Sequence, residues 1–171
     1  MQKEEFIREV MVHKQKLFRF ALSYLGQAEE ASDVVQDVLL RLWETRAKLL
    51  ALRSIEAWSM TLVRNSCLDR LKRSEHKLRV YSPAADYLRQ QPDQGSNPAQ
   101  ALLQKETEAL ISAALDQLPE KQRAAFQLRD VQGYSYLEIS EILSIDMNQV
   151  KVNIFRARKA LREALTKSRE S

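Results

Sequence analysis

The chain has 171 residues, 44% of them hydrophobic and 29% charged, which is the composition of a globular protein with one ordinary domain or two small ones. Its 3 Gly and 4 Pro argue against collagen-like chains and turn-rich β-sandwiches, and they leave no glycine-rich phosphate loop. Lys and Arg total 27 against 23 Asp and Glu, so the net charge is only +4 and its distribution is more informative than its sum.

Three helices are predicted in the first 79 residues. Apolar residues from Phe6 to Leu25 predict a first helix that ends near Gly26. The second follows the i, i+3, i+4, i+7, i+8 pattern of a helix that buries one face, with Ala31, Val34, Val35, Val38, Leu39, Leu42 and Trp43. The third begins near Ser54, a suitable N-cap, and continues through Leu62 and Leu71. The spacing of Trp58 to Leu62 predicts a structural role in the core for this tryptophan.

The second helix has an additional polar face. Asp33, Gln36 and Asp37 are spaced i, i+3, i+4, opposite much of the apolar stripe. Residues 28–37 contain four acidic residues and no basic one, whereas residues 63–79 contain six basic and two acidic ones. This pattern indicates either solvated helix faces or separate surfaces for a basic protein and for a polyanion.

Residues 80–104 hold three of the four prolines and one of the three glycines, and the hydrophobic periodicity lapses there. This composition predicts a flexible linker between two small helical domains, residues 1–79 and 105–171. Because no stretch requires a strand, the predicted fold class is all-α.

After this segment, apolar residues from Leu110 to Leu118 predict a helix that stops before Pro119. Pro119 suits the opening turn of the next helix, which reaches Gly133. Two capping signatures follow, one from Ser135 to Glu138 and one from Asp146 to Gln149. The two helices that these signatures predict are separated at 144–146, and these three residues have the length of the turn in a helix-turn-helix motif.

The last predicted helix combines an apolar stripe with a basic face. The stripe consists of Val150, Ile154, Ala157, Leu161 and Leu165. The side chains that fall off it are Lys151, Val152, Phe155, Arg156 and Lys159. Such a face offers cations and apolar groups to phosphates and base edges, as a recognition helix does. An ordinary helical hairpin with a basic outer face is the alternative.

Three segments in this order resemble the bacterial extracytoplasmic-function (group 4) sigma factors of the sigma-70 family. They are AEEASDVVQDVLLRLW, SIEAWSMTLVRNSCLDRLKR and LDQLPEKQRAAFQLRDVQGYSYLEISEILSIDMNQVKVNIFRARKALREAL. The resemblance covers almost the whole chain apart from the linker. It implies a sigma2-like helical bundle at 1–79 and a sigma4-like helix-turn-helix domain at 105–171.

The resemblance also implies a function, promoter-directed transcription initiation by core RNA polymerase. The implied partners are the clamp helices of the largest polymerase subunit, the polymerase flap, promoter DNA and an anti-sigma factor. The clamp would bind Asp33, Gln36 and Asp37, and the loop at about 45–54 would help to melt the −10 element. The −10 DNA would contact Arg64, Asn65, Arg70, Lys72 and Arg73. The −35 element would be read by Lys151, Val152, Phe155, Arg156 and Lys159.

The sequence departs from the family in the turn and the recognition helix. Relatives usually have Gly where this chain has Ser144, and many have Arg or Ser at the positions of Asn153 and Val152. Val152 and Phe155 suit contacts with thymine methyl groups.

Other function classes fit the sequence less well. His13, His76 and the single cysteine, Cys67, form no metal-ligand spacing, and there is no Walker loop or nucleophile elbow. We therefore expect no enzyme, metal or cofactor. One cysteine, no signal peptide and no membrane-length apolar stretch favour the cytoplasm. A helical adaptor and a repressor or activator that binds duplex DNA without polymerase are the alternatives.

Overall fold

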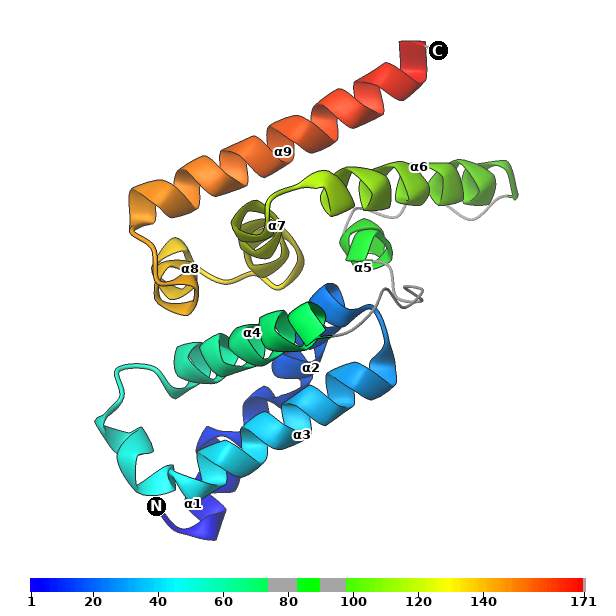
Figure 1. The fold of residues 1–171 in the computed structure, drawn as a ribbon. Helices are drawn as coiled ribbons and strands as arrows, with labels where there is room; N and C mark the ends of the chain where they lie inside the picture. Colours follow the sequence, from blue (N-terminus) through cyan, green and yellow to red (C-terminus); the bar gives the residue numbers. More distant parts are fainter. Residues whose placement is uncertain (74–82, 90–97, 171) are drawn as a thin grey trace. The chain divides into compact units, whose positions relative to one another are not determined.

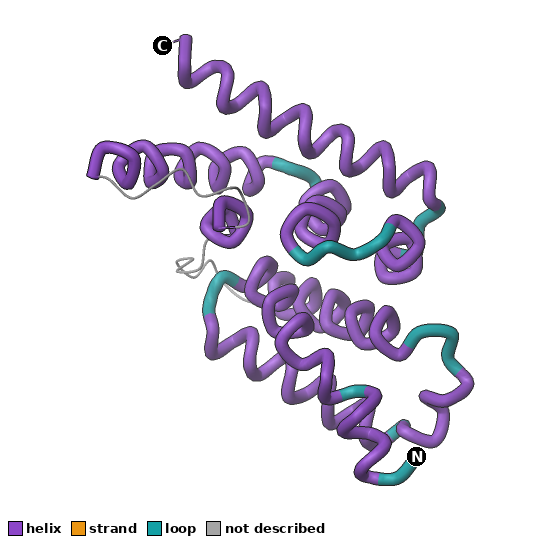
Figure 2. Tube along the Cα trace, turned by 180° about the vertical axis from the view of Figure 1, so that it is seen from behind, coloured by secondary structure: helices purple, strands orange, loops and turns teal. Residues whose placement is uncertain are grey.

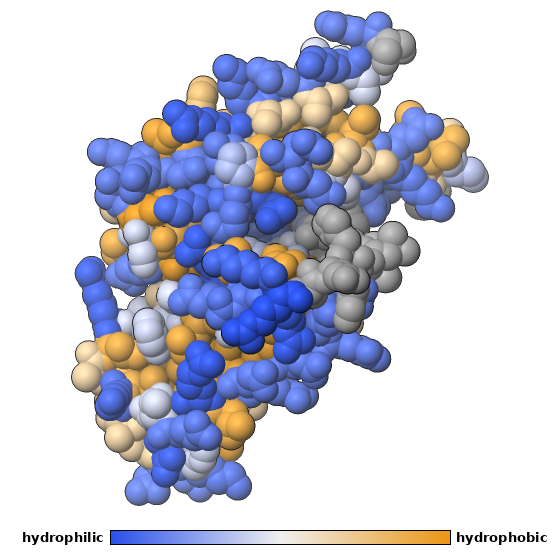
Figure 3. Space-filling model, viewed as in Figure 1, coloured by the Kyte–Doolittle hydropathy of each residue, from blue (hydrophilic) through white to orange (hydrophobic). Residues whose placement is uncertain are grey.

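The computed structural model describes residues 1–73, 83–89 and 98–170, and all regular elements in these ranges are helical (Figures 1 and 2). The chain divides into two compact units, Met1–Tyr81 and Ser82–Ser171. The predicted all-α class is confirmed for the part of the chain that the structure describes. In the space-filling view, hydrophilic side chains cover most of the visible surface, and apolar groups show in patches (Figure 3).

The described residues of the first unit, 1–73, form four α-helices and two short 3₁₀ segments. The α-helices are α1 (Lys3–Glu9), α2 (Lys14–Leu25), α3 (Ala28–Glu44) and α4 (Ile55–Arg73), and the 3₁₀ segments are Met11–His13 and Arg46–Ala51. α2, α3 and α4 pack against one another (Figure 1). Their shared core is built from the predicted apolar stripe of α3, except for the half-buried Trp43, together with Leu17, Phe20, Met60 and Val63.

The predicted first helix, from Phe6 to Gly26, is wrong in one respect, because the 3₁₀ segment Met11–His13 divides it into α1 and α2. Val10 and Leu17, on either side of this break, are both fully buried. A spacing of seven residues between buried side chains is what an unbroken helix also gives, so periodicity alone does not reveal the break.

The predicted start of α4 is confirmed. The backbone N–H of Ala57 donates to Ser54 Oγ over 3.1 Å, which is the N-cap contact expected of this serine. The predicted core position of Trp58 is wrong: α4 turns Ala57 and Met60 inward and leaves Trp58 42% exposed.

In the second unit, the residues that the structure describes form five α-helices and one π-helical segment. They are α5 (Pro83–Arg89), α6 (Pro98–Gln117), α7 (Glu120–Phe126), the π-helical segment Gln127–Val131, α8 (Tyr136–Leu143) and α9 (Met147–Glu170). α9 packs on α6, α7 and α8 (Figure 1). The core between these helices consists of Ala84, Ile111, Leu115, Leu118, Phe126, Val131, Ala157 and Leu161.

Part of the segment predicted as linker, 80–104, is helical. α5 lies inside it, and Ala84 of this helix is fully buried. The ring of Tyr87 lies 5.3 Å from that of Phe126, so α5 belongs to the core of the second unit. α5 and α6 both begin with a proline, which suits the first helical position because its missing N–H would have no intrahelical partner. Pro83 and Pro98, two of the three prolines in this segment, are therefore helix starts, and Pro92 lies outside the described residues.

The two capping signatures of the second unit are confirmed. Glu138 N donates to Ser135 Oγ over 3.1 Å, and Ser135 N donates to Glu138 Oε1 over 3.0 Å. The same reciprocal pair joins Asp146 and Gln149, at 2.7 and 3.1 Å. The first pair caps the start of α8 and the second caps the start of α9, and α8 ends at Ser144 between them, so α8 and α9 form the predicted helix-turn-helix.

Ser144 adopts the left-handed conformation in this turn, with φ 55° and ψ 45°. Only glycine enters this region without steric cost. Ser144→Gly is therefore expected to raise the free energy of unfolding of the second unit by about 0.5–1 kcal/mol. Gly133, at φ 79°, provides the reverse test, and Gly133→Ala is expected to lower it by about 1 kcal/mol. Urea unfolding followed by circular dichroism measures both, and a destabilised Ser144→Gly variant would contradict this account of the turn.

Candidate protein and nucleic-acid interfaces

The first candidate surface is the polar face of α3. Asp33, Gln36 and Asp37 are all exposed, while Val34 and Val38 between and beside them are buried. The structure thus brings the three predicted residues together on one side of a helix whose other side is fixed in the core. Leu40 continues this face by one turn and is 58% exposed, so an apolar group lies next to the carboxylates.

The second candidate surface is the basic end of α4. Asn65, Lys72 and Arg73 are exposed there, whereas Arg64 and Arg70 are half-buried. Arg70 turns toward α3, where its Nη1 lies 3.9 Å from Asp33 Oδ2. The five predicted residues therefore do not form one uniform face.

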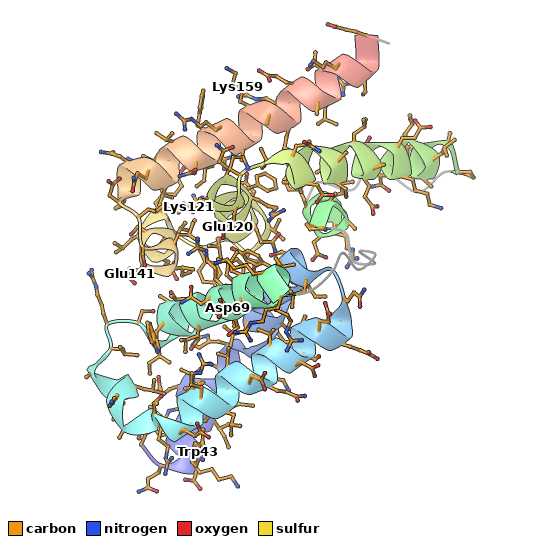
Figure 4. All side chains as sticks on the ribbon, in the orientation of Figure 1. Trp43, Asp69, Glu120, Lys121, Glu141 and Lys159 are labelled. Carbon is orange, nitrogen blue, oxygen red and sulfur yellow. The ribbon has the colours of Figure 1, made fainter. Side chains whose placement is uncertain are left out.

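The acidic and basic surfaces of the first unit meet in a hollow of about 350 Å³. Its walls are Val34 and Asp37 from α3 and Ser66, Asp69, Arg70 and Arg73 from α4. Asp69 is labelled on α4 in Figure 4. The sequence did not predict this meeting, because the residues come from two helices and only their packing brings them together.

A group of exposed apolar residues lies just before and within the first turn of α4. Leu50, Leu52 and Trp58 are all at least 36% exposed. Exposed apolar side chains beside a basic helix suit unstacked nucleic-acid bases, whose flat faces stack on such groups. Sequence reasoning missed Trp58 because its spacing to Leu62 matches that of a core residue.

The outward face of α9 is the third candidate surface. Lys151, Val152, Phe155, Arg156 and Lys159 are all exposed and fall within one arc of the helix, and Lys159 is labelled on its outer side in Figure 4. Phe155 is 60% exposed and Val152 43%, although both are apolar. The structure brings all five predicted residues together.

Asn153 and Gln149, which lie near this face, use polar atoms of their side chains in hydrogen bonds within the motif. Asn153 Nδ2 donates to the backbone oxygen of Gln149 over 2.8 Å, and the Gln149 side chain is used in the cap with Asp146. The amide nitrogen of Asn153 and the amide oxygen of Gln149 are thus engaged within the helix-turn-helix itself. The cationic and apolar groups of α9 are the ones that face outward.

A bidentate ion pair, missed in the sequence, joins α9 to the π-helical segment at the edge of the outward face. Arg158 Nε donates to Asp130 Oδ2 over 2.8 Å, and Arg158 Nη2 donates to Asp130 Oδ1 over 2.5 Å. These hydrogen bonds raise the pKa of Arg158 above its ordinary value, and partial burial opposes them. Because the two residues are 28 positions apart, no local pattern could have revealed the pair.

Cys67 lies on the buried side of α4. Burial raises the pKa of its thiol from the ordinary 9.0 to about 12, against an opposing effect of the Arg70 charge. The folded first unit therefore contains the neutral thiol. The stabilisation of the first unit by this buried thiol is complete below pH 9 and is lost as the pH rises from 9 to 12, because the thiol of the unfolded chain loses its proton first.

This burial leads to a labelling prediction. Cys67 is expected to resist a thiol-reactive disulfide reagent at pH 7.5 and to react completely once urea unfolds the first unit, because the nucleophile is an accessible thiolate. Spectrophotometric labelling in a urea series measures this. Rapid stoichiometric labelling without urea would show that α4 does not bury Cys67.

Each of the two units matches a known protein family. The family model "Sigma-70 region 2" matches residues 10–77, and "Sigma-70, region 4" matches residues 108–161. No helix within the described ranges is long and apolar enough to span a membrane.

Individual proteins match over most of the chain. The ECF RNA polymerase sigma factor SigL of Mycobacterium tuberculosis is 32% identical over 158 residues, which cover 90% of this chain and 84% of SigL. The ECF RNA polymerase sigma factor SigE of Mycolicibacterium smegmatis is 30% identical, with 96% of this chain and 62% of SigE covered. This chain thus spans somewhat less than two thirds of the length of SigE.

Among solved structures, the fold is similar to that of the sigma factor RpoE from Bartonella quintana, solved in complex with the anti-sigma factor NepR. The TM-score is 0.63 at 24% sequence identity, and the match covers 95% of this chain and 98% of RpoE. This similarity supports the two-unit helical fold.

Proposed function

We infer the roles of the three surfaces from one premise: the chain belongs to the extracytoplasmic-function RNA polymerase sigma factors of the sigma-70 family. As a sigma factor, it binds core RNA polymerase and directs transcription initiation to promoters. We assign polymerase and −10 binding to residues 1–79 and −35 binding to residues 105–171. Residues 80–104, of which α5 and the start of α6 are helical, connect these functions.

The observation that carries this proposal is the outward face of α9. A capped turn presents the helix, a buried stripe holds it, and five exposed side chains combine positive charge with apolar groups. Lys151, Arg156 and Lys159 suit phosphates and guanine edges, while Val152 and Phe155 suit thymine methyl groups. We propose that this face reads the −35 element in the major groove of duplex DNA.

The polar face of α3 is proposed to bind the clamp helices of the largest polymerase subunit. Its two carboxylates and one amide complement a basic coiled coil, because charge-assisted hydrogen bonds to Arg are strong and directional. The exposed Leu40 beside them offers an apolar contact that would be covered on docking.

The basic end of α4 and the segment before it are proposed to hold the melted −10 element. Lys72 and Arg73 are exposed for phosphate contacts, together with Arg64, Asn65 and Arg70 from the same helix. The exposed Leu50, Leu52 and Trp58 supply apolar surface for unstacked bases. Trp58 is thus added to the residues predicted from the sequence.

We further propose that the chain acts in the bacterial cytoplasm without catalysis or cofactor of its own, and that an anti-sigma factor regulates it. The anti-sigma factor follows from the family, in which RpoE of Bartonella quintana was solved with NepR. The polymerase flap is a further proposed partner of the second unit.

Run-off transcription tests the function. Purified core polymerase with this chain is expected to initiate at discrete sites in a genomic library, and core alone is not. A gel shift separates the alternatives, because a sigma factor shifts promoter DNA only with core, a repressor or activator shifts it alone, and an adaptor shifts nothing. A sequence-specific shift without core would overturn the proposal.

A further inference from the structure

The segment Gln127–Val131, between α7 and α8, is π-helical. Its wider turn is closed by the backbone N–H of Gln132, which donates to Gln127 O over 3.0 Å, five residues back. π-helical turns are rare and often occur at functional sites, since the extra residue changes the direction of the side chains around it. In this protein the segment directly precedes the helix-turn-helix.

Two consecutive residues of this segment contact the two helices of the motif. Arg129 Nη1 donates to Tyr134 O over 2.9 Å, and its guanidinium lies 4.8 Å from the ring centroid of Tyr136, the first residue of α8. Asp130 accepts both hydrogen bonds from Arg158 of α9. The π-helical segment therefore contacts the start of α8 through Arg129 and the middle of α9 through Asp130.

The position of Arg158 in α9 makes its ion pair with Asp130 relevant to DNA binding. Arg158 lies two residues after Arg156 and one before Lys159, both on the outward face of α9. The guanidinium fork fixes its carboxylate partner in one plane and at two points, so it restrains rotation of the helix as well as its distance. The Asp130 side chain is 17% exposed and that of Arg158 is 45% exposed, so the pair is shielded from water on the Asp130 side only.

A small rotation of α9 matters for base reading. Side-chain tips lie roughly 5–6 Å from a helix axis, so a rotation of about 15° moves them by roughly 1.5 Å. Hydrogen bonds to base edges tolerate only a few tenths of an ångström in length. The apolar stripe buries α9, but dispersion contacts have no preferred direction and restrain rotation less sharply than a bidentate ion pair.

We propose that Asp130 is a positioning residue for −35 reading: by holding Arg158, it sets the rotation of α9 and thereby the direction of Phe155, Arg156 and Lys159. The proposal rests on the proposed function and deepens it, because it names a specificity determinant that is not one of the five exposed residues of α9. Asp130 lines the same hollow as Lys151 and Phe155, and the proposed effect is exerted through its ion pair with Arg158.

The experiment compares Asp130→Asn with Glu163→Gln in holoenzyme. Both variants remove one negative charge from the second unit, and Glu163 is exposed on α9 beyond the reading face. Binding is measured to a −35 duplex that the wild-type holoenzyme selects from a random-sequence library, and to a scrambled duplex of the same composition. Both variants are expected to bind scrambled DNA slightly better, because less negative charge faces the phosphates. Only Asp130→Asn is expected to lower the ratio of selected to scrambled binding, by about tenfold.

A double-mutant cycle separates positioning from mere stability. Arg158→Gln is expected to lower the same ratio, and Asp130→Asn with Arg158→Gln to lower it no further, because either change alone breaks the pair. Circular dichroism at the assay temperature checks that each variant is folded. Arg158→Lys keeps the charge but cannot make the bidentate contact, so it is expected to retain an intermediate ratio of selected to scrambled binding.

Three results overturn the inference: equal ratios for Asp130→Asn and Glu163→Gln, additive losses in the cycle, or a loss that follows the unfolded fraction. Failure of the proposed function looks different, because the wild-type holoenzyme would then select no duplex at all.

Discussion

Asp37→Arg is expected to abolish assembly of the chain with core RNA polymerase, and Asp33→Arg is expected to do the same. Each change places a cation on the face of α3 that is proposed to meet the basic clamp helices. Like charges brought together at an interface cost several kcal/mol, so the dissociation constant is expected to rise by about 100-fold or more. Fluorescence anisotropy of labelled chain titrated with core measures this loss.

The folded chain itself is expected to tolerate these reversals. Both carboxylates are exposed and lie off the buried stripe of α3, so the free energy of unfolding is expected to change by about 0.5 kcal/mol or less for Asp37→Arg. Asp33→Arg also replaces the ion pair with Arg70 by a like-charge contact, so a loss of up to about 1 kcal/mol is expected there. Glu4→Arg on α1 is the matched control, since it makes the same charge change at an exposed position of the same unit. Wild-type affinity for core in the double variant of Asp33 and Asp37 would rule out this face as the polymerase site.

The second large effect concerns the two DNA surfaces, which are expected to act at different steps. Arg156→Ala and Lys151→Ala are expected to weaken the closed complex, Arg156→Ala by about 1–3 kcal/mol if it reads a base. Lys72→Ala and Arg70→Ala are expected to impair opening of the −10 DNA instead. Lys72→Ala is the cleaner of these two, because Arg70 also forms an ion pair with Asp33.

Permanganate footprinting on a duplex promoter and on a pre-melted bubble distinguishes the two steps. Pre-melting is expected to rescue Lys72→Ala and Arg70→Ala, since the DNA no longer has to be opened, and to leave Arg156→Ala impaired. Rescue of Arg156→Ala by the bubble, without rescue of Lys72→Ala, would reverse the assignment of the −35 and −10 roles to the two units.

Local sequence signals predicted the helix-turn-helix well. Each cap depends on two residues three positions apart, and the apolar stripe of α9 repeats within a single helix, so both can be read along the chain. The same holds for the polar face of α3, in which Asp33, Gln36 and Asp37 are within five residues of one another.

Features that depend on packing between distant segments were not predicted. The ion pairs of Asp130 with Arg158 and of Asp33 with Arg70 join residues that are 28 and 37 positions apart. The helix α5 was missed because its first residue, Pro83, also suits a linker. The exposed position of Trp58 depends on which side of α4 meets α2 and α3, and a four-residue spacing does not decide this.

Site-specific photocrosslinking tests the central assignment most directly. A photoreactive amino acid is placed at Val152 on α9 or at Asn65 on α4, both exposed, and the holoenzyme is irradiated on a promoter found by run-off transcription. The account predicts that position 152 crosslinks to duplex DNA in the −35 element and that position 65 crosslinks to the −10 element, both only with core present. Crosslinks at the opposite elements, or the same crosslinks without core polymerase, would contradict it.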